Sequence, residues 1–145
     1  MKSKRQIYET YILPVALHAS ETMTWSSAML QKIDIFNNHV MRWMLGVRLR
    51  DKTSIAQLRK VTRVKPILPA IKSRKLAWFG PIKRSTLPLR TTFEGLVEGR
   101  RKRGRPRRRW RDDVEEWCEA CDGWDDINNL ARDREKWRSQ CNAFC

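Results

Sequence analysis

Long apolar runs are missing from this sequence. No run approaches the roughly 18 apolar residues that a membrane-spanning helix needs, and the first residues lack the apolar core of a secretory signal peptide. We therefore expect a soluble intracellular protein with no membrane partner.

Recognisable catalytic signatures are also missing. The chain has no Ser-His-Asp set, no phosphate-binding loop and no paired-Asp polymerase motif. The acids Asp112, Asp113, Glu115 and Glu116 could suggest a metal-dependent nuclease, but acids in the first turn of a helix complement its dipole and can neutralise neighbouring arginines. We therefore assign no catalytic residue and expect neither enzymatic activity nor a small-molecule substrate.

Cysteine is absent from the first 117 residues, which argues against the framework of a disulfide-stapled secreted domain. The four cysteines fall in the last 28 residues, as Cys118, Cys121, Cys141 and Cys145. Two interpretations stay open. The spacing is compatible with a four-thiolate zinc site, or the thiols fill space among tryptophans. The sequence predicts no other cofactor.

What the chain has in excess is positive charge. Its 31 Lys and Arg against 16 Asp and Glu give +15, and this charge is unevenly spread. Residues 1–99 carry 18 basic and 6 acidic side chains, residues 100–111 carry nine basic and none acidic, and residues 112–145 carry four basic and ten acidic. Such a balance favours an anionic partner.

The segment 100–111 is too cationic to be buried, because unpaired guanidinium groups lose far more solvation than packing returns. It must lie in water or against a polyanion, and nucleic acid is the obvious candidate. We predict that its binding residues are Arg100, Arg101, Lys102, Arg103, Gly104, Arg105, Pro106, Arg107, Arg108, Arg109 and Arg111.

Three interpretations of this segment stay open. Arg103-Gly104-Arg105-Pro106 is the core of an AT-hook, whose arginines lie flat in a narrow A·T minor groove. General binding to the phosphate backbone needs only charge. A nuclear-localisation signal is the third interpretation, and we expect a nuclear protein, or else a cytoplasmic one.

A second basic segment, residues 72–84, interleaves cations with Trp78 and Phe79, as a strand-stacking surface would. Aromatics at helical spacing are more often core, and we expect at least one of the two to be buried. The cations predicted to face nucleic acid here are Lys72, Arg74, Lys75, Lys83 and Arg84.

Apolar spacing predicts an all-α chain. Two helical pieces meet near Pro14. A longer helix follows a Ser26 or Ser27 cap, ends at Gly46, and carries an apolar stripe of Met29, Ile33, Phe36, Val40, Trp43 and Val47. Ser54 with Gln57 forms a capping box. We expect a helix from Pro66 to be broken or kinked at Gly80-Pro81, and a Trp-rich helical hairpin to follow residue 110.

Five blocks of residues, in the same order along the chain, resemble the C-terminal part of non-LTR retrotransposon (LINE-type, RTE/Jockey-like) endonuclease–reverse transcriptases. They are Ile7–Val15 with Ser20-Glu21-Thr22, Arg42–Val47, Arg74–Gly80, Gly104–Arg107 through Trp110–Asp112, and Leu130–Arg138. The likeness covers nearly the whole chain. The family usually has Gly-His where Gly80-Pro81 stands.

Charge and spacing divide the chain into a helical region over residues 1–96, a basic AT-hook-like linker over 97–111 and an acidic helical hairpin over 112–145. The resemblance implies that the first region is thumb-like and that the basic segment helps to hold template RNA and target DNA. It implies a nucleic-acid-binding fragment of an RNA-directed DNA polymerase, without the catalytic palm. The family's catalytic aspartates would lie upstream of Met1, so no catalytic residue is carried over. The alternative is a protein-interaction or zinc-binding helical module with a basic tether.

Overall fold

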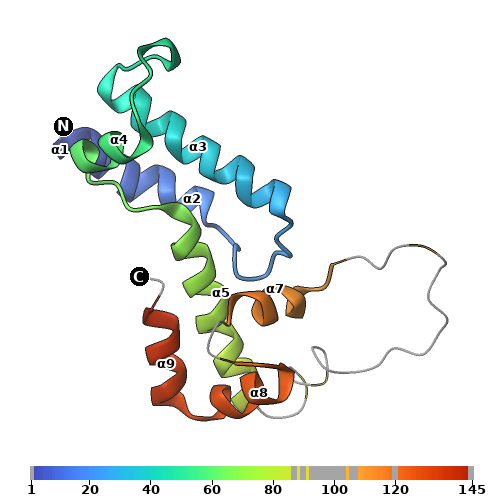
Figure 1. Cartoon of the computed structure of the whole chain (residues 1–145). Coiled ribbons are helices and arrows are strands. Elements are labelled where there is room, and N and C mark those ends of the chain that lie inside the picture. Colours follow the sequence, from blue (N-terminus) through green and yellow to red (C-terminus); the bar gives the residue numbers. More distant parts are fainter. Residues whose placement is uncertain are drawn as a thin grey trace. The chain divides into compact units, whose positions relative to one another are not determined.

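A computed structural model of the chain (Figure 1) describes residues 2–85, 88, 91, 104, 108–118 and 121–143. Every regular element in these ranges is helical, which confirms the all-α prediction. The elements are α1 (Lys2–Ile7), the π-helical turn η1 (Tyr8–Ile12), α2 (Leu13–Ala16), α3 (Ser27–Leu45), the 3-10 turn η2 (Leu49–Asp51), α4 (Ile55–Thr62), α5 (Ile67–Arg84), α7 (Trp110–Trp117), α8 (Trp124–Arg132) and α9 (Arg134–Asn142).

The chain forms two compact units, each with its own core. The N-terminal unit comprises Met1–Ser20 and Trp25–Ile71, and the C-terminal unit comprises Glu21–Thr24 and Lys72–Cys145. These bounds differ from the predicted boundary at residue 96, because later turns of α5 carry Leu76 and Phe79 into the C-terminal core.

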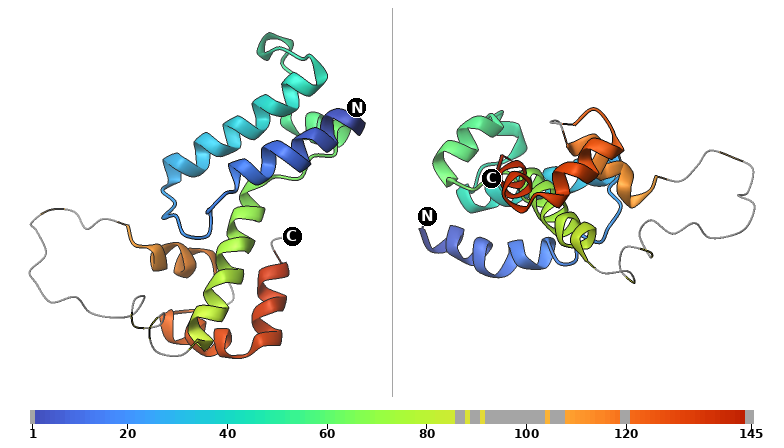
Figure 2. Two further views of the ribbon diagram at one scale, coloured as in Figure 1. Left: turned by 180° about the vertical axis from the view of Figure 1, so that it is seen from behind. Right: turned by 90° about the horizontal axis from the view of Figure 1, so that it is seen from below.

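In the N-terminal unit, α1, η1 and α2 run antiparallel to α3 (Figures 1 and 2). The Lys4 ammonium donates to the carbonyl of Met44 at 3.1 Å, near the end of α3, and the Tyr8 hydroxyl donates to Asn37 Oδ1 at 2.7 Å. The wide η1 turn ends at Ile12, two residues before Pro14. A proline ring collides with the carbonyl four residues earlier in a regular α-helix, so the junction predicted near Pro14 takes the form of a π-helical turn.

The caps predicted for α3 and α4 are confirmed. Ser26 Oγ accepts from the Met29 amide at 3.3 Å, and Gly46 ends α3 with a left-handed φ of 69°. At α4, Ser54 and Gln57 exchange hydrogen bonds of 3.2 and 3.3 Å, the reciprocal pattern of a capping box.

The apolar stripe predicted for α3 is correct at Val40 and wrong at Met29, Phe36 and Trp43, which are exposed. Its buried face is Asn37, Val40, Met41 and Met44, whereas Trp43 is 73% exposed. Asparagine is usually a surface residue, so the sequence pattern did not indicate that Asn37 is buried. The hydrogen bond from the Tyr8 hydroxyl compensates for burial of its amide oxygen. The core of this unit combines that face with residues of three other segments: Tyr8, Leu58 and Val64.

The predicted helical hairpin after residue 110 is instead three helices, α7, α8 and α9. The break falls at Asp133, whose carboxylate accepts from the amides of Glu135 and Lys136, both at 3.1 Å, and so caps α9. The hydrogen bond from the Lys136 amide lowers the pKa of Asp133. The apolar positions Ile127, Trp137 and Cys141 are nevertheless all buried in the C-terminal core, as their spacing predicts.

The sequence predicts a break or a kink at Gly80-Pro81, but helix α5 continues through both residues to Arg84, so the helix is not broken there. Gly80 lies against α9: a Cβ atom at this position would come within 2.5 Å of Trp137 Cδ1. The missing side chain leaves room for Trp137 Nε1 to donate to the Leu76 carbonyl at 2.8 Å. Figure 2 shows α9 beside α5.

We expect Gly80→Ala to destabilise the C-terminal unit by about 1–3 kcal/mol, the usual cost of overpacking, because the Trp137 ring must move. The measurement is urea unfolding followed by tryptophan fluorescence. Gly123→Ala is the matched control, since nothing lies within 4 Å of a Cβ atom there. Equal stability of the two variants would contradict this packing.

We expect Tyr8 to make stability fall in alkali. Burial raises the pKa of Tyr8 to about 12 from 10.0, so the folded chain retains the phenolic proton that the unfolded chain loses. The contribution of neutral Tyr8 is complete below pH 10 and is lost as the pH rises from 10 toward 12. Between about pH 9 and pH 11.5, wild type should lose about 2 kcal/mol more free energy of unfolding than Tyr8→Phe. Tyr11→Phe should behave as wild type; identical losses in all three proteins would contradict the assignment.

Candidate nucleic-acid interface

Only part of the predicted basic segment falls within the described residues. Arg100, Arg101, Lys102, Arg103, Arg105, Pro106 and Arg107 lie outside them, and so does the AT-hook interpretation of that stretch. Gly104 is exposed, with a φ of 134°. Arg108 and Arg109 precede α7, and Arg111 lies in its first turn.

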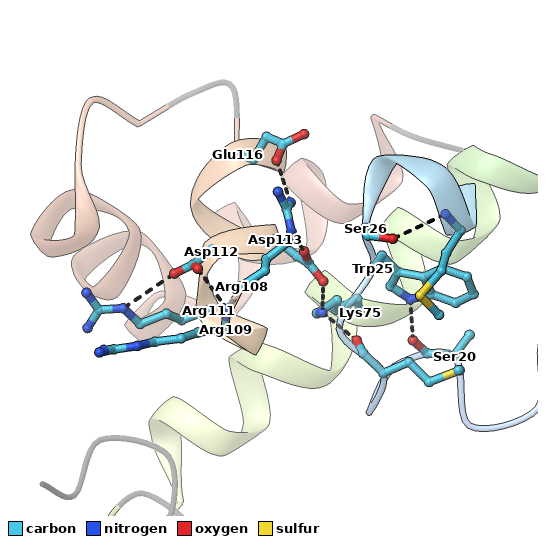
Figure 3. A network of polar contacts seen from close by, with 12 residues as sticks. Ser20, Trp25, Ser26, Lys75, Arg108, Arg109, Arg111, Asp112, Asp113 and Glu116 are labelled. Carbon is cyan, nitrogen blue, oxygen red and sulfur yellow. Dashed lines mark hydrogen bonds and ion pairs between the residues drawn. The ribbon is translucent and has the colours of Figure 1, made fainter. Parts of the chain in front are cut away.

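Arg108 is held by the acids of α7 (Figure 3). Its Nε donates to Asp113 Oδ1 at 2.6 Å, and its Nη2 pairs with Glu116 Oε2. Next to it, the Asp112 carboxylate accepts from the Arg109 amide at 2.7 Å and lies 4.0 Å from the Arg111 guanidinium. The acids at the start of α7 therefore cap the helix and neutralise neighbouring arginines, as the sequence suggested.

The prediction that Lys75 faces outward is wrong. Its side chain has no exposed surface, and its ammonium pairs with Asp113, which is equally buried (Figure 3). The same Nζ donates to the carbonyl of Met23 at 2.7 Å and lies 4.7 Å from the centroid of the Trp110 ring. Lys75 therefore belongs to the core of the C-terminal unit and is not available to a ligand.

Burial of Lys75 is tolerable because several groups replace its hydration. The Asp113 carboxylate, the Met23 carbonyl and the negative face of the Trp110 ring all attract the ammonium. Desolvation lowers the pKa of Lys75, and the hydrogen bond to Asp113 opposes that effect. Trp110 Nε1 also donates to the Glu21 carbonyl at 2.7 Å. Residues 21–24, α5 and α7 thus meet at one buried ion pair.

The other predicted cations of α5 do not form one face. Lys72 and Lys83 are half-buried, with ammonium groups 5.7 Å from the Trp117 ring and 5.0 Å from the Trp124 ring. Arg74 is exposed, and it lies about 200° around the helix from Lys72, at 100° per residue. Arg84 is also exposed, and its Nη1 donates to the Ala131 carbonyl.

Two aromatic predictions have different outcomes. Phe79 is buried among Trp110, Trp124 and Trp137, which confirms that at least one of Trp78 and Phe79 is core.

In the N-terminal unit, the sequence did not predict that Trp43 is an exposed aromatic residue. Its ring lies 6.3 Å from that of His39, one turn earlier on α3. Its apolar spacing gave no signal of exposure.

The cysteines were predicted either to bind zinc or to pack among tryptophans. Cys118 and Cys141 are buried in the C-terminal core with Trp137, as the packing interpretation expects. Cys145 lies outside the described residues. Within the part of the chain that the structure describes, no three His, Cys, Asp or Glu side chains are grouped as metal ligands.

The fold and the charge together define an all-α chain with a strongly basic segment. The chain is 24% identical, over 149 residues, to a putative uncharacterized transposon-derived protein of Caenorhabditis elegans. That alignment covers 94% of this chain and 53% of the relative, so the chain spans about half the relative's length. This chain is therefore related to a transposon-derived protein. No protein-family model and no solved structure matches it.

Among the helices in the described ranges, none combines the length and the apolar character needed to cross a bilayer.

We expect Lys75→Met to destabilise the C-terminal unit by about 3 kcal/mol, because it leaves one oxygen of the buried Asp113 carboxylate and the Met23 carbonyl without a donor, and only Arg108 still pairs with Asp113. The measurement is chemical unfolding at neutral pH. Adding Asp113→Leu to the variant should restore much of the loss, since no uncompensated charge then remains buried. Arg138→Met, at an exposed position of α9, should change stability by less than about 0.5 kcal/mol. A Lys75→Met protein as stable as that control would contradict the buried pair.

Proposed function

We propose that this chain is the nucleic-acid-binding C-terminal part of a LINE-type reverse transcriptase, without the catalytic palm. The observation that carries the proposal is the segment 100–111, in which nine cations occur without an acid. Phosphates are the partner that such a density of charge favours. The ordered likeness of five sequence blocks to this family and the relationship to a transposon-derived protein support the same origin.

Contacts of Arg108 and Arg111 with acids of α7 separate the end of the basic segment from residues 100–107. Arg108 is held by Asp113 and Glu116, and Arg111 lies near Asp112. Because those carboxylates already balance the end of the segment, we assign phosphate binding chiefly to residues 100–107. Arg108 then marks the point at which the segment joins the C-terminal unit.

The N-terminal unit offers further support. Residues 1–20 and 25–71 contain 12 basic and 3 acidic side chains, a net charge of +9. On α3 of this unit, the exposed Trp43 ring and the neighbouring His39 ring present flat faces of the kind on which unpaired bases stack. A basic surface with an exposed aromatic suits a single-stranded or partly paired template.

The salt dependence of binding tests the proposal. Replacing Arg101, Arg103, Arg105 and Arg107 by alanine should flatten the fall of log affinity with log salt by up to about 0.9 for each phosphate of duplex DNA that the variant no longer neutralises. The matched control replaces Arg132, Arg134, Lys136 and Arg138, which are exposed on or next to α8 and α9, and removes the same charge. The measurement is fluorescence anisotropy with labelled RNA and DNA at several salt concentrations.

The two variants separate a binding site from a general effect of charge. Only the first should lose most of its affinity; equal losses in both, or no binding by wild type at low salt, would overturn the proposal. The same assay discriminates the modes of binding. Preference for an A·T-tract duplex over a G·C duplex, lost in the first variant, supports minor-groove recognition, and equal affinity for both supports backbone contacts.

A further inference from the structure

Two thiols lie side by side in the C-terminal unit. Cys118 directly follows α7, and Cys121 comes three residues later. The Cys121 amide donates to the Cys118 carbonyl at 3.3 Å, and the two Sγ atoms are 3.4 Å apart. A disulfide bond is about 2.05 Å long. The sulfurs are therefore not bonded, but approach by about 1.4 Å would join them.

The two thiols differ in their access to solvent. Cys118 is 1% exposed and belongs to the C-terminal core. Cys121 is only partly buried and lines an open recess of about 550 Å³, whose walls include Asp126, Asp133 and Lys136 from α8 and α9. A reagent in solution can therefore reach the Cys121 thiol more readily than the Cys118 thiol, and Cys121 lies within 3.4 Å of Cys118.

We propose that Cys118 and Cys121 are a redox-active pair that exchanges with low-molecular-weight disulfides such as oxidised glutathione. An accessible thiol with a second thiol beside it suits two-step exchange, in which the first forms a mixed disulfide and the second resolves it. The inference does not rest on the proposed nucleic-acid function, because neither thiol belongs to the basic segment.

The exchange balances in two steps. The Cys121 sulfur, after losing its proton to water, attacks one sulfur of glutathione disulfide; the S–S bond breaks, and one glutathione leaves as a thiolate that takes up a proton. Cys118 then loses its proton and attacks the Cys121 sulfur of the mixed disulfide, which expels the second glutathione. The two cysteines lose two electrons and two protons, and glutathione disulfide gains both.

The recess favours a small thiol partner with charged groups. Asp126 offers a carboxylate in the recess that Cys121 lines, and Asp133 and Lys136 form an ion pair there at 3.4 Å. The recess therefore presents charges of both signs to the amine and carboxylates of a peptide-sized thiol. We therefore assign the small molecule as the first reactant.

The test uses the full-length chain, reduced and then equilibrated with defined ratios of oxidised and reduced glutathione. Remaining thiols are alkylated under denaturing conditions, and the protein is analysed by mass spectrometry and peptide mapping. Wild type and Cys141→Ser should each lose two alkylatable thiols and join Cys118 to Cys121. Cys118→Ala should stop at a glutathione adduct on Cys121, and Cys121→Ser should form no adduct on Cys118.

Several results would overturn the proposal. They are retention of all thiols under oxidising ratios, pairing of Cys121 with Cys141 or Cys145, and equal adduct formation on Cys118 and Cys121 in the single variants. Zinc that co-purifies and blocks alkylation would also do so, in favour of a metal site. Circular dichroism of each variant shows whether it folds, and the two wild-type readings, thiol loss and linkage, stand without any variant.

Discussion

The C-terminal unit is organised around a buried ion pair between Lys75 and Asp113. Neither side chain has exposed surface, so both charges have lost their hydration and each depends on the other. The Lys75 ammonium also reaches the Met23 carbonyl, and Trp110 holds the Glu21 carbonyl. Three segments far apart in the sequence, residues 21–24, α5 and α7, are thereby held together at this pair.

Asp113 connects this core to the basic segment. One of its oxygens accepts from Lys75 and the other from Arg108, whose second hydrogen-bond partner is Glu116. The positively charged residues therefore have two roles. Lys75 and Arg108 pair with carboxylates of α7 and stabilise the fold, whereas we assign the cations of residues 100–107 to phosphate binding. Charge density alone does not separate these roles, because Lys75 lies within a basic stretch and contributes nothing to a binding surface.

The two proposals concern different parts of the chain. Nucleic-acid binding depends on the basic segment and on the charge of the N-terminal unit, and it suits a chain related to a transposon-derived protein. The dithiol depends on the turn after α7 and on the recess between α8 and α9. Because α7 carries the carboxylates that hold Arg108, and Cys118 directly follows its last residue, both features depend on one short helix.

Local features could be read from the sequence because their causes lie within one or two turns. The Ser26 cap, the Ser54–Gln57 box and the end of α3 at Gly46 each need only neighbouring residues. The helical spacing of Ile127, Trp137 and Cys141 also indicates which positions of α8 and α9 are buried. The break between these helices was missed although Asp133 is a local capping signal, because the apolar spacing continues across it.

The sequence by itself determined the all-α class, most of the helices and the position of the cationic segment. Only the tertiary structure decided which face of α3 is buried, where Lys75 lies and which cysteine faces solvent. The reason is distance along the chain. Asp113 is 38 residues from Lys75, and Tyr8 is 29 residues from Asn37. A hydrogen-bond or ion-pair partner this far along the chain allows a polar residue to be buried, and the local periodicity of the sequence does not predict such a partner.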